Sequence, residues 1–216
     1  MLWIIIGILV SYLVGSIPTA YIFGRLFKGV DIRKVGSGNV GATNAMRVLG
    51  RGTGITVLLL DILKGLLTVI FLGNFLIFRT QVIPEENLRL ILGLVCICGH
   101  NWTIFLRFKG GKGVATTLGV LLGLTFNIPG LRIVLGLLIL SWLVVFLATR
   151  IISVASIISA LVFPVFLFIF RRSFVNFSTF MLLGTIFSVF IILRHKSNLM
   201  RILQGKEPKL SFKKPK

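Results

Sequence analysis

Residues 2–24, LWIIIGILVSYLVGSIPTAYIFG, form an apolar run that contains no charged residue. A run of this length can cross the hydrocarbon core of a bilayer as a single helix. No basic segment precedes it and no small-residue cleavage pattern ends it. We therefore interpret it as a first membrane span and not as a signal peptide.

Similar runs recur along the chain and predict an all-α integral membrane protein. Of the 216 residues, 56% are hydrophobic and 13% are charged, whereas about 25% are charged in ordinary soluble domains. The mean hydropathy is +1.03. We expect a single membrane-embedded domain, residues 1–216, with seven transmembrane helices at roughly 2–24, 53–72, 88–106, 113–126, 131–148, 152–170 and 178–193. The fourth is short, so it could be tilted, half-buried or partly re-entrant.

Basic residues outnumber acidic residues by 24 to five, and the formal net charge is +19. With seven spans, 18 of the Lys and Arg residues fall in four polar segments on one face: 25–52, 107–113, 149–151 and 194–216. The positive-inside rule places this face in the cytoplasm, with the N-terminus outside and the C-terminus inside. The excess charge suits anionic membrane lipids or an anionic substrate. Nucleic acid is not expected, because the basic residues are scattered between spans.

A polar segment, GSGNVGATN at 36–44, interrupts this pattern. Gly36, Gly38 and Gly41 match G-x-G-x-x-G, but no strand precedes them and the following acid, Asp61, lies inside a span, so we reject a dinucleotide-binding fold. Glycines still let backbone N–H groups approach an anion, and a helix expected over 42–49, ended by a glycine, would add positive potential. The segment therefore predicts a phosphate-binding loop; the alternative is a capped turn at the membrane surface.

Polar side chains of this segment can cap the helix or hydrogen-bond a ligand: Ser37, Asn39, Thr43 and Asn44. Arg47 follows one turn later. A second glycine-rich basic segment, FKGGKGVATT at 108–117, precedes another expected helix on the same face. It is not a Walker A motif, because Gly113 follows Lys112. Lysines at a membrane edge often contact only lipid phosphates, but Arg47 and Lys112 together favour a site for two anions.

Both histidines lie next to polar segments. His195 follows the last span and is the candidate for proton handling, because imidazole titrates near neutral pH. Asn198 shares its face if the chain is helical there. Ser153, at the start of the sixth span, is either an N-cap or a catalytic group. His100 is expected to pack beside Trp102 at headgroup depth.

Asp61 and Lys64 place two charges inside the second span, three residues apart. An unpaired charge there costs about 2.5–3.5 kcal/mol or more, so we expect a structural ion pair. Cys96 and Cys98 lie in an apolar stretch and are interpreted as packing residues. The acids and histidines lack the spacing of metal ligands, and neither a metal nor a cofactor is expected.

Six segments, taken in order, resemble the bacterial acyl-phosphate:glycerol-3-phosphate acyltransferase family: GSIPTAY, DIRKVGSGNVGATNAMRVLG, LDILKG, GHNWTIFLRFKGGKGVATTLG, RIISVAS and RHKSNLMRILQGKEPKL. The resemblance runs from Gly15 to about Leu210. It implies a seven-helix enzyme of the bacterial inner membrane with its active site at the cytoplasmic face. The enzyme would move a fatty acyl group from acyl phosphate to glycerol 3-phosphate, giving lysophosphatidic acid in the first step of phospholipid synthesis. Neither acyl carrier protein nor coenzyme A would be the direct donor.

The resemblance also implies the site residues. The expected catalytic groups are Ser37, Arg47, Lys112, Ser153, His195 and Asn198. The expected substrate-binding residues are Gly36, Gly38, Asn39, Gly41, Thr43, Asn44, Gly110, Gly111 and Gly113. Asp61, Lys64, His100 and Glu207 are expected to be structural. Ser197 stands where the family commonly has an acid; if that acid orients the histidine in the family, another group must orient His195 here.

Acyl phosphate is a mixed anhydride and is already activated, so we expect direct attack by the glycerol 3-phosphate hydroxyl. Ser37 and Ser153 would donate hydrogen bonds and would not be acylated. The proton would pass to His195 or to a substrate phosphate oxygen. A transporter of a phosphorylated solute is the main alternative, although we detect no internal repeat. A scaffolding membrane protein is a third, and it leaves both glycine-rich loops unexplained.

Overall fold

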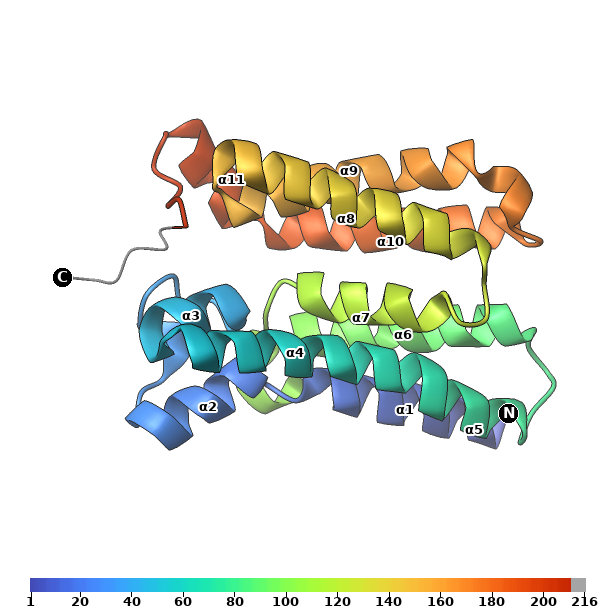
Figure 1. Cartoon of the computed structure of the whole chain (residues 1–216). Helices are drawn as coiled ribbons and strands as arrows, with labels where there is room; N and C mark the ends of the chain where they lie inside the picture. The colour runs from blue at the N-terminus through green and yellow to red at the C-terminus, as the bar shows by residue number, and fades with distance from the viewer. Residues whose placement is uncertain (211–216) are drawn as a thin grey trace. The chain divides into compact units, whose positions relative to one another are not determined.

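The computed structural model describes residues 1–210, and all regular elements in that range are helices (Figure 1). Three of the C-terminal lysines counted above, Lys213, Lys214 and Lys216, lie outside the described residues. Internal contacts divide the chain into two compact units, Met1–Ile128 and Pro129–Lys216. The two units are described separately below.

The first unit contains ten helical elements within the described chain. They are α1 (Leu2–Ser16), α2 (Thr19–Lys28), η1 (Ile32–Lys34), α3 (Ala42–Leu49), α4 (Arg51–Leu67), η2 (Thr68–Leu72), α5 (Gly73–Ile77), α6 (Glu85–Asn101), η3 (Ile104–Leu106) and α7 (Val114–Leu124). The described part of the second unit contains α8 (Gly130–Thr149), α9 (Ile152–Ile169), η4 (Arg171–Ser173), α10 (Phe177–Arg194) and α11 (Lys196–Leu203).

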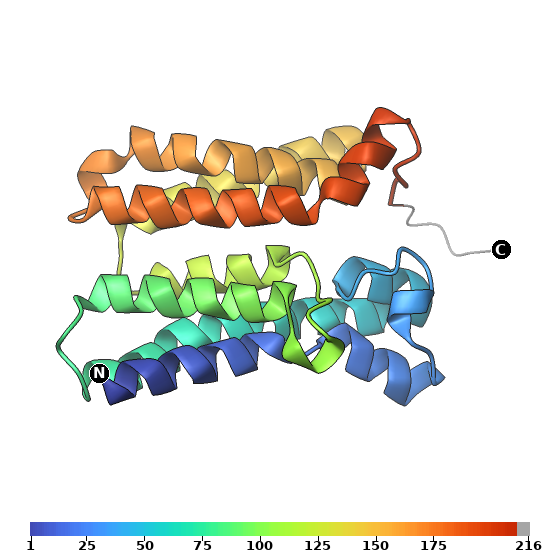
Figure 2. The same ribbon diagram turned by 180° about the vertical axis from the view of Figure 1, so that it is seen from behind.

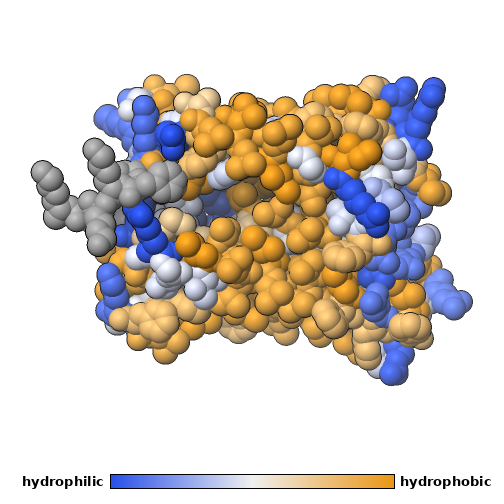
Figure 3. Space-filling view, viewed as in Figure 1, coloured by the Kyte–Doolittle hydropathy of each residue, from blue (hydrophilic) through white to orange (hydrophobic). Residues whose placement is uncertain are grey.

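Six segments of the described chain are long and apolar enough to cross a membrane: Leu2–Lys28, Arg51–Ile77, Glu85–Leu106, Gly130–Thr149, Ile152–Ile169 and Phe177–Arg194. They correspond to six of the seven expected spans. The remaining one contains α7, which has 11 residues. At about 1.5 Å per residue it is shorter than a hydrocarbon core of about 30 Å. On the face seen in Figure 3, hydrophobic residues cover most of the middle of the surface, and hydrophilic residues gather towards its two ends.

The first apolar run is broken and is not one continuous helix. Helix α1 ends at Ser16, and α2 begins at Thr19 after Pro18. Proline has no N–H and disfavours a helical conformation in the residue before it, so the helix ends at this point. The break leaves the carbonyl oxygen of Ile17 without a helical partner, and the side chain of Lys64 donates to it at 3.2 Å.

Small residues bring the helices of the first unit close together. Helix α1 packs along α6 (Figure 2), where a Cβ on Gly15 or Gly99 would overlap backbone atoms of the other helix. Helix α4 packs along α7 in the same way, through Gly65 and Gly119. Glycine and other small residues favour such close packing between membrane helices. The buried thiol of Cys96 packs within this unit, and Cys96 and Cys98 are both free, as expected.

In the second unit, α9 packs against both α8 and α10. The indole N–H of Trp142 on α8 donates to the hydroxyl of Ser156 on α9 at 3.2 Å. Gly184 on α10 lies directly under the side chain of Leu167 on α9. At the turn between α8 and α9, the carbonyl oxygen of Arg150 accepts a hydrogen bond from the backbone N–H of Leu210 at 2.8 Å. This bond ties the C-terminal segment to the end of the bundle where Ser153 lies.

Candidate active site

The loop at 36–44 is held in shape by the side chain of Asn44. Its Oδ1 accepts from the backbone N–H of Ser37 at 2.9 Å, and its Nδ2 donates to three carbonyl oxygens, each at 3.1 Å, of Ile32, Val35 and Asn39. Asn44 is 1% exposed. The residue expected to bind a ligand or cap a helix therefore bonds to the backbone of the loop, which wraps around it.

The turns of this loop need glycine. Gly36 and Gly38 have φ values of 63° and 70°, in the left-handed region. Gly41 is the N-cap of α3, and this helix covers 42–49 and ends at Gly50, as expected. Ser37 is exposed at the surface of the loop. The loop thus leads into the N-terminus of α3, a feature that binds anions.

The side chains around the loop are predominantly cationic. Arg47 is exposed on α3, while Asn39 and Thr43 are half-buried beside it. The one acid between residues 25 and 52 is Asp31, which forms a 2.7 Å ion pair with Arg33. The hydrogen bond from Arg33 lowers the pKa of Asp31 to about 2. This carboxylate is thus neutralised by its partner, and the segment keeps a positive potential.

The second loop lies on the C-terminal end of α6. The backbone N–H groups of Gly110 and Gly111 donate to the carbonyl oxygens of Asn101 and His100, at 3.2 and 3.0 Å. These carbonyls belong to the last turn of α6, where carbonyl oxygens have no N–H partners within their own helix. Gly113, whose φ is 78°, is the N-cap residue of α7. Lys112 is half-buried at this turn, next to the N-terminus of α7.

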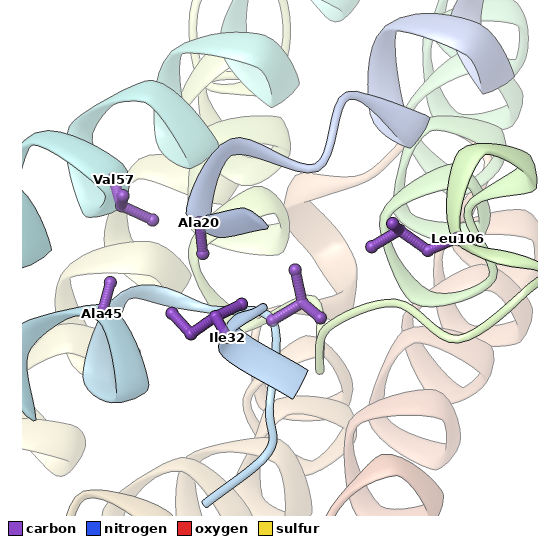
Figure 4. Packing of buried hydrophobic residues seen from close by; sticks show 6 residues of the cluster. Ala20, Ile32, Ala45, Val57 and Leu106 are labelled. Carbon is purple, nitrogen blue, oxygen red and sulfur yellow. The ribbon is translucent and has the colours of Figure 1, made fainter. Parts of the chain in front are cut away.

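The two loops meet within the first unit. Val40 of the first loop and Leu106, which precedes the second, belong to one buried cluster with Ala20, Ile32, Ala45 and Val57 (Figure 4). A Cβ on Gly111 would lie 2.9 Å from the carbonyl oxygen of Val40. These two glycine-rich segments therefore lie against each other, and residues next to both of them share one apolar cluster.

The ion pair expected inside the second span is present on α4. Lys64 Nζ is 2.8 Å from Asp61 Oδ1, and Thr19 donates to the same oxygen at 3.0 Å. Lys64 Nζ also lies 2.9 Å from His100 Nδ1. His100 is buried and bonded to this pair; sequence reasoning placed it only beside Trp102. The sequence did contain a signal for this contact. An imidazole ring and two charged groups inside apolar helices each need a hydrogen-bonding or charged partner.

In the second unit, His195 follows the last residue of α10. Its Nδ1 is 2.7 Å from the carbonyl oxygen of Ile191, one turn earlier in that helix. A carbonyl can only accept, so Nδ1 carries the hydrogen. The Ile191 carbonyl therefore orients the ring of His195, whereas Ser197, the position at which the resemblance implied an acid, is exposed.

Three side chains converge on Glu207 in the same unit. Ser153 Oγ donates to Oε1 at 2.7 Å, Asn198 Nδ2 donates to the same oxygen, and Arg201 Nε donates to Oε2 at 2.7 Å. Burial raises the pKa of Glu207, but the hydrogen bonds from these three residues together bring it below its ordinary value. Arg201 was missed from sequence, although it shares a face of α11 with Asn198 at a spacing of three residues.

Within residues 1–210, no group of three or more His, Cys, Asp or Glu side chains is arranged to hold a metal ion. The expected site residues thus fall into two sets. One comprises the two loops of the first unit with the buried Asp61–Lys64–His100 group beneath them. The other comprises His195 and the Glu207 cluster in the second unit.

Comparison with known proteins gives consistent matches along nearly the whole chain. The family model described as "Glycerol-3-phosphate acyltransferase" matches residues 5–205. A protein of that name from Fusobacterium nucleatum is 40% identical over 205 residues, covering 95% of this chain and 97% of the relative. One from Chlorobium phaeobacteroides strain BS1 is 42% identical, covering 98% of each.

Two solved structures are also similar to this chain. Both are of PlsY (YgiH), described as an integral membrane glycerol 3-phosphate acyltransferase. The glycerol 3-phosphate form is 35% identical with a TM-score of 0.81, covering 96% of each chain. The lysophosphatidic acid form is 33% identical with a TM-score of 0.77, covering 96% of this chain and 95% of the other.

Proposed function

The chain belongs to the glycerol-3-phosphate acyltransferase family, and on that premise we propose that it transfers a fatty acyl group from acyl phosphate to a hydroxyl of glycerol 3-phosphate. Membership favours the enzyme over the transporter and the scaffold considered from sequence. The solved relatives are a glycerol 3-phosphate form and a lysophosphatidic acid form, which correspond to the acceptor and the product of this reaction. The observation that carries the proposal is the meeting of two glycine-rich, cationic loops in one unit.

The first unit binds the phosphate groups in this proposal. Backbone N–H groups at the N-terminus of α3, the hydroxyl of Ser37 and the charges of Arg47 and Lys112 contact the two anions. Gly110, Gly111 and Gly113 shape the second loop, and Asn44 holds the first loop in place. Bringing two anions together supplies proximity, which can contribute several kcal/mol to catalysis. The fixed N–H dipoles and cations also stabilise charge on the departing phosphate.

Chemistry proceeds by direct transfer. The hydroxyl oxygen of glycerol 3-phosphate forms a bond to the acyl carbon, and the bond from that carbon to the phosphate oxygen breaks. Inorganic phosphate leaves with its electron pair. We assign the proton of the hydroxyl to His195 Nε2, which carries the lone pair when Nδ1–H is bonded to Ile191. Ser153 and Asn198, held by the structural residue Glu207, contact substrate as hydrogen-bonding groups.

The whole chain works as one acyltransferase domain in the bacterial inner membrane, with seven crossings and the loops at the cytoplasmic face. Support for the seventh crossing comes from residues 113–127. Gly113 lies against the side chain of Asn101, at the end of α6. Asn127 donates at 3.1 Å to Glu85, at the start of α6. This segment therefore runs the length of a helix that belongs to a segment long and apolar enough to cross a membrane.

The donor is tested with detergent-purified protein and labelled glycerol 3-phosphate. Acyl phosphate, acyl-coenzyme A and acyl carrier protein are supplied in separate reactions, and lipid-soluble product is extracted. We expect product with acyl phosphate alone, and the same rate after treatment with a metal chelator. Product from either thioester in the absence of acyl phosphate would overturn the proposed donor. Loss of activity with the chelator would contradict the expectation that no metal takes part.

The phosphate-binding role of Lys112 is tested with a matched pair in one loop. Lys112→Met should raise KM for one phosphate substrate by about tenfold or more, because a charged hydrogen bond contributes about 1.5–3 kcal/mol. Lys109→Met removes an exposed lysine three residues away and should change KM much less. An unchanged KM for both substrates in Lys112→Met would remove Lys112 from the site.

A further inference from the structure

We propose that His100 is a positioning residue that links the buried Asp61–Lys64 ion pair to the loop carrying Lys112. One edge of its ring accepts a hydrogen bond from the ion pair, and the opposite edge supports the backbone at Gly111. The inference rests on the proposed function, because its consequence is the placement of a phosphate-binding lysine.

The first step is the tautomer of His100. An ammonium group has three N–H donors and accepts no hydrogen bond. Lys64 Nζ has three oxygen or nitrogen partners: Asp61 Oδ1 at 2.8 Å, His100 Nδ1 at 2.9 Å and the Ile17 carbonyl at 3.2 Å. With all three donors used, His100 Nδ1 must be the acceptor. The ring is therefore neutral, and its hydrogen lies on Nε2.

The second step is the rigidity of this group. Asp61, Lys64 and His100 are 2%, 7% and 8% exposed. Thr19 gives Asp61 a second donor at 3.0 Å. A buried pair with its hydrogen bonds satisfied has one preferred arrangement, because a broken contact would leave a charge without a partner in an apolar region. The Nδ1 edge of His100 is therefore anchored to α4 and to the break between α1 and α2.

The third step is the opposite edge of the ring. A Cβ on Gly111 would overlap His100 Nε2 and would lie 2.9 Å from Cε1. The imidazole therefore occupies the space in which a side chain at 111 would lie. The backbone N–H of Gly111 also donates to the carbonyl oxygen of His100 at 3.0 Å. His100 thus contacts Gly111 through both its backbone and its ring, and Lys112 is the next residue in the chain.

Gly111 also contacts the first loop, because a Cβ added at Gly111 would lie 2.9 Å from the carbonyl oxygen of Val40. A shift of the His100 ring would therefore move the second loop relative to the first. Displacement of a binding group by about 1 Å can cost about a hundredfold in activity. The effect belongs mainly to substrate binding, because His100 acts through the loop and not on the reacting atoms.

Two amide substitutions separate the two edges of the ring. In His100→Asn, the side-chain oxygen reaches the Nδ1 position and still accepts from Lys64, but nothing fills the Nε2 position. In His100→Gln, the longer side chain places an N–H at the Nε2 position and the contact with Lys64 is weakened. We expect His100→Asn to raise KM for a phosphate substrate about tenfold or more with a small change in unfolding temperature. We expect His100→Gln to lower the unfolding temperature with a smaller change in KM.

A purely structural role of His100 would lower the unfolding temperature in both variants and would give the two variants the same KM. That result would overturn the proposal. The wild-type protein supplies an independent measurement. Nitrogen-15 NMR of labelled histidines, assigned with His195→Asn, should find the hydrogen of His100 on Nε2; a hydrogen on Nδ1 would also overturn it. If wild-type protein makes no product from acyl phosphate, the proposed donor fails, and the tautomer still decides the positioning role.

Discussion

At Gly111, the structure has no room for any side chain. A Cβ there would overlap the ring of His100 and press on the carbonyl oxygen of Val40. Overpacking of a buried position costs about 1–3 kcal/mol and shifts the backbone. We expect Gly111→Ala to lower the unfolding temperature and raise KM, because the loop carrying Lys112 must move. Gly52→Ala, where nothing lies near the added Cβ, is the matched control and should change neither quantity.

Steady-state kinetics and thermal unfolding in detergent measure both effects. A Gly111→Ala enzyme with wild-type KM and stability would show that the loop can absorb a methyl group without moving. The close approach of His100 to the loop would then have no functional consequence.

The Ile191 carbonyl replaces the acid that the family pattern would place at Ser197. His195→Asn keeps a donor to Ile191 but removes Nε2, so the local structure should survive. We expect the loss of general-base catalysis to lower kcat by about 10²- to 10⁴-fold with little change in unfolding temperature. Ser197→Ala should leave kcat within a factor of about two, because Ser197 is exposed. A large loss of kcat in Ser197→Ala would mean that the carbonyl does not suffice to orient the ring.

Residue types in the loops could be predicted from sequence, but their bonds could not. Glycines, cations and polar side chains in two short loops indicate phosphate binding whatever their exact geometry. The inward direction of Asn44 depends on how the loop closes around it. The bond between Lys64 and His100 joins positions 36 residues apart. Neither feature produces a local sequence pattern, so only the fold reveals them.

At the scale of elements, Glu207 connects α9, α11 and the C-terminal segment through its three donors. Its pKa is below the ordinary value of 4.5. A lowered carboxyl pKa adds stability that is fully present above the unfolded-state value and is lost as the pH falls through the folded-state value. We expect Glu207→Gln to lower the unfolding temperature by a constant amount from pH 7 to about pH 5. Below that range the difference from wild type should shrink, since the protonated acid resembles the amide.

Thermal unfolding of both proteins from pH 7 to pH 4 measures this difference. Gln204→Ala changes an exposed residue of the same segment and should leave the curve unchanged. A difference that grows as the pH falls would have the wrong sign for a carboxylate with a lowered pKa.

The elements themselves could largely be predicted from sequence. The short helix over 42–49 and six of the seven apolar spans occur where the periodicity and length place them. Pro18 indicates a kink in the 2–24 run, and the structure breaks the helix at this point. The hydrogen bond from Lys64 to the carbonyl oxygen of Ile17 could not be predicted, because it joins positions 47 residues apart in the chain.

At the scale of the whole molecule, the number of crossings decides on which side of the membrane every later segment lies. If residues 113–127 cross, the count is seven, and Gln81, Phe126 and Ser173 face outside while Gln204 faces the cytoplasm. If they do not cross, Phe126 and Ser173 face the cytoplasm and Gln204 faces outside. These four residues are exposed, and none belongs to the proposed site, so each can be replaced by cysteine.

We expect seven crossings, because 113–127 runs from Asn101 to Glu85 along α6 and the basic segments then share one face. Single cysteines are placed at these positions in a Cys96→Ala, Cys98→Ala background and treated in intact cells with a membrane-impermeant maleimide. Cysteines at 81, 126 and 173 should be labelled, and the one at 204 only after the cells are opened. Gln81 precedes the disputed segment, so its labelling is the same for both counts and serves as the control. Labelling of position 204 in intact cells, with 126 and 173 protected, would establish six crossings and place the His195 cluster on the opposite side from Lys112.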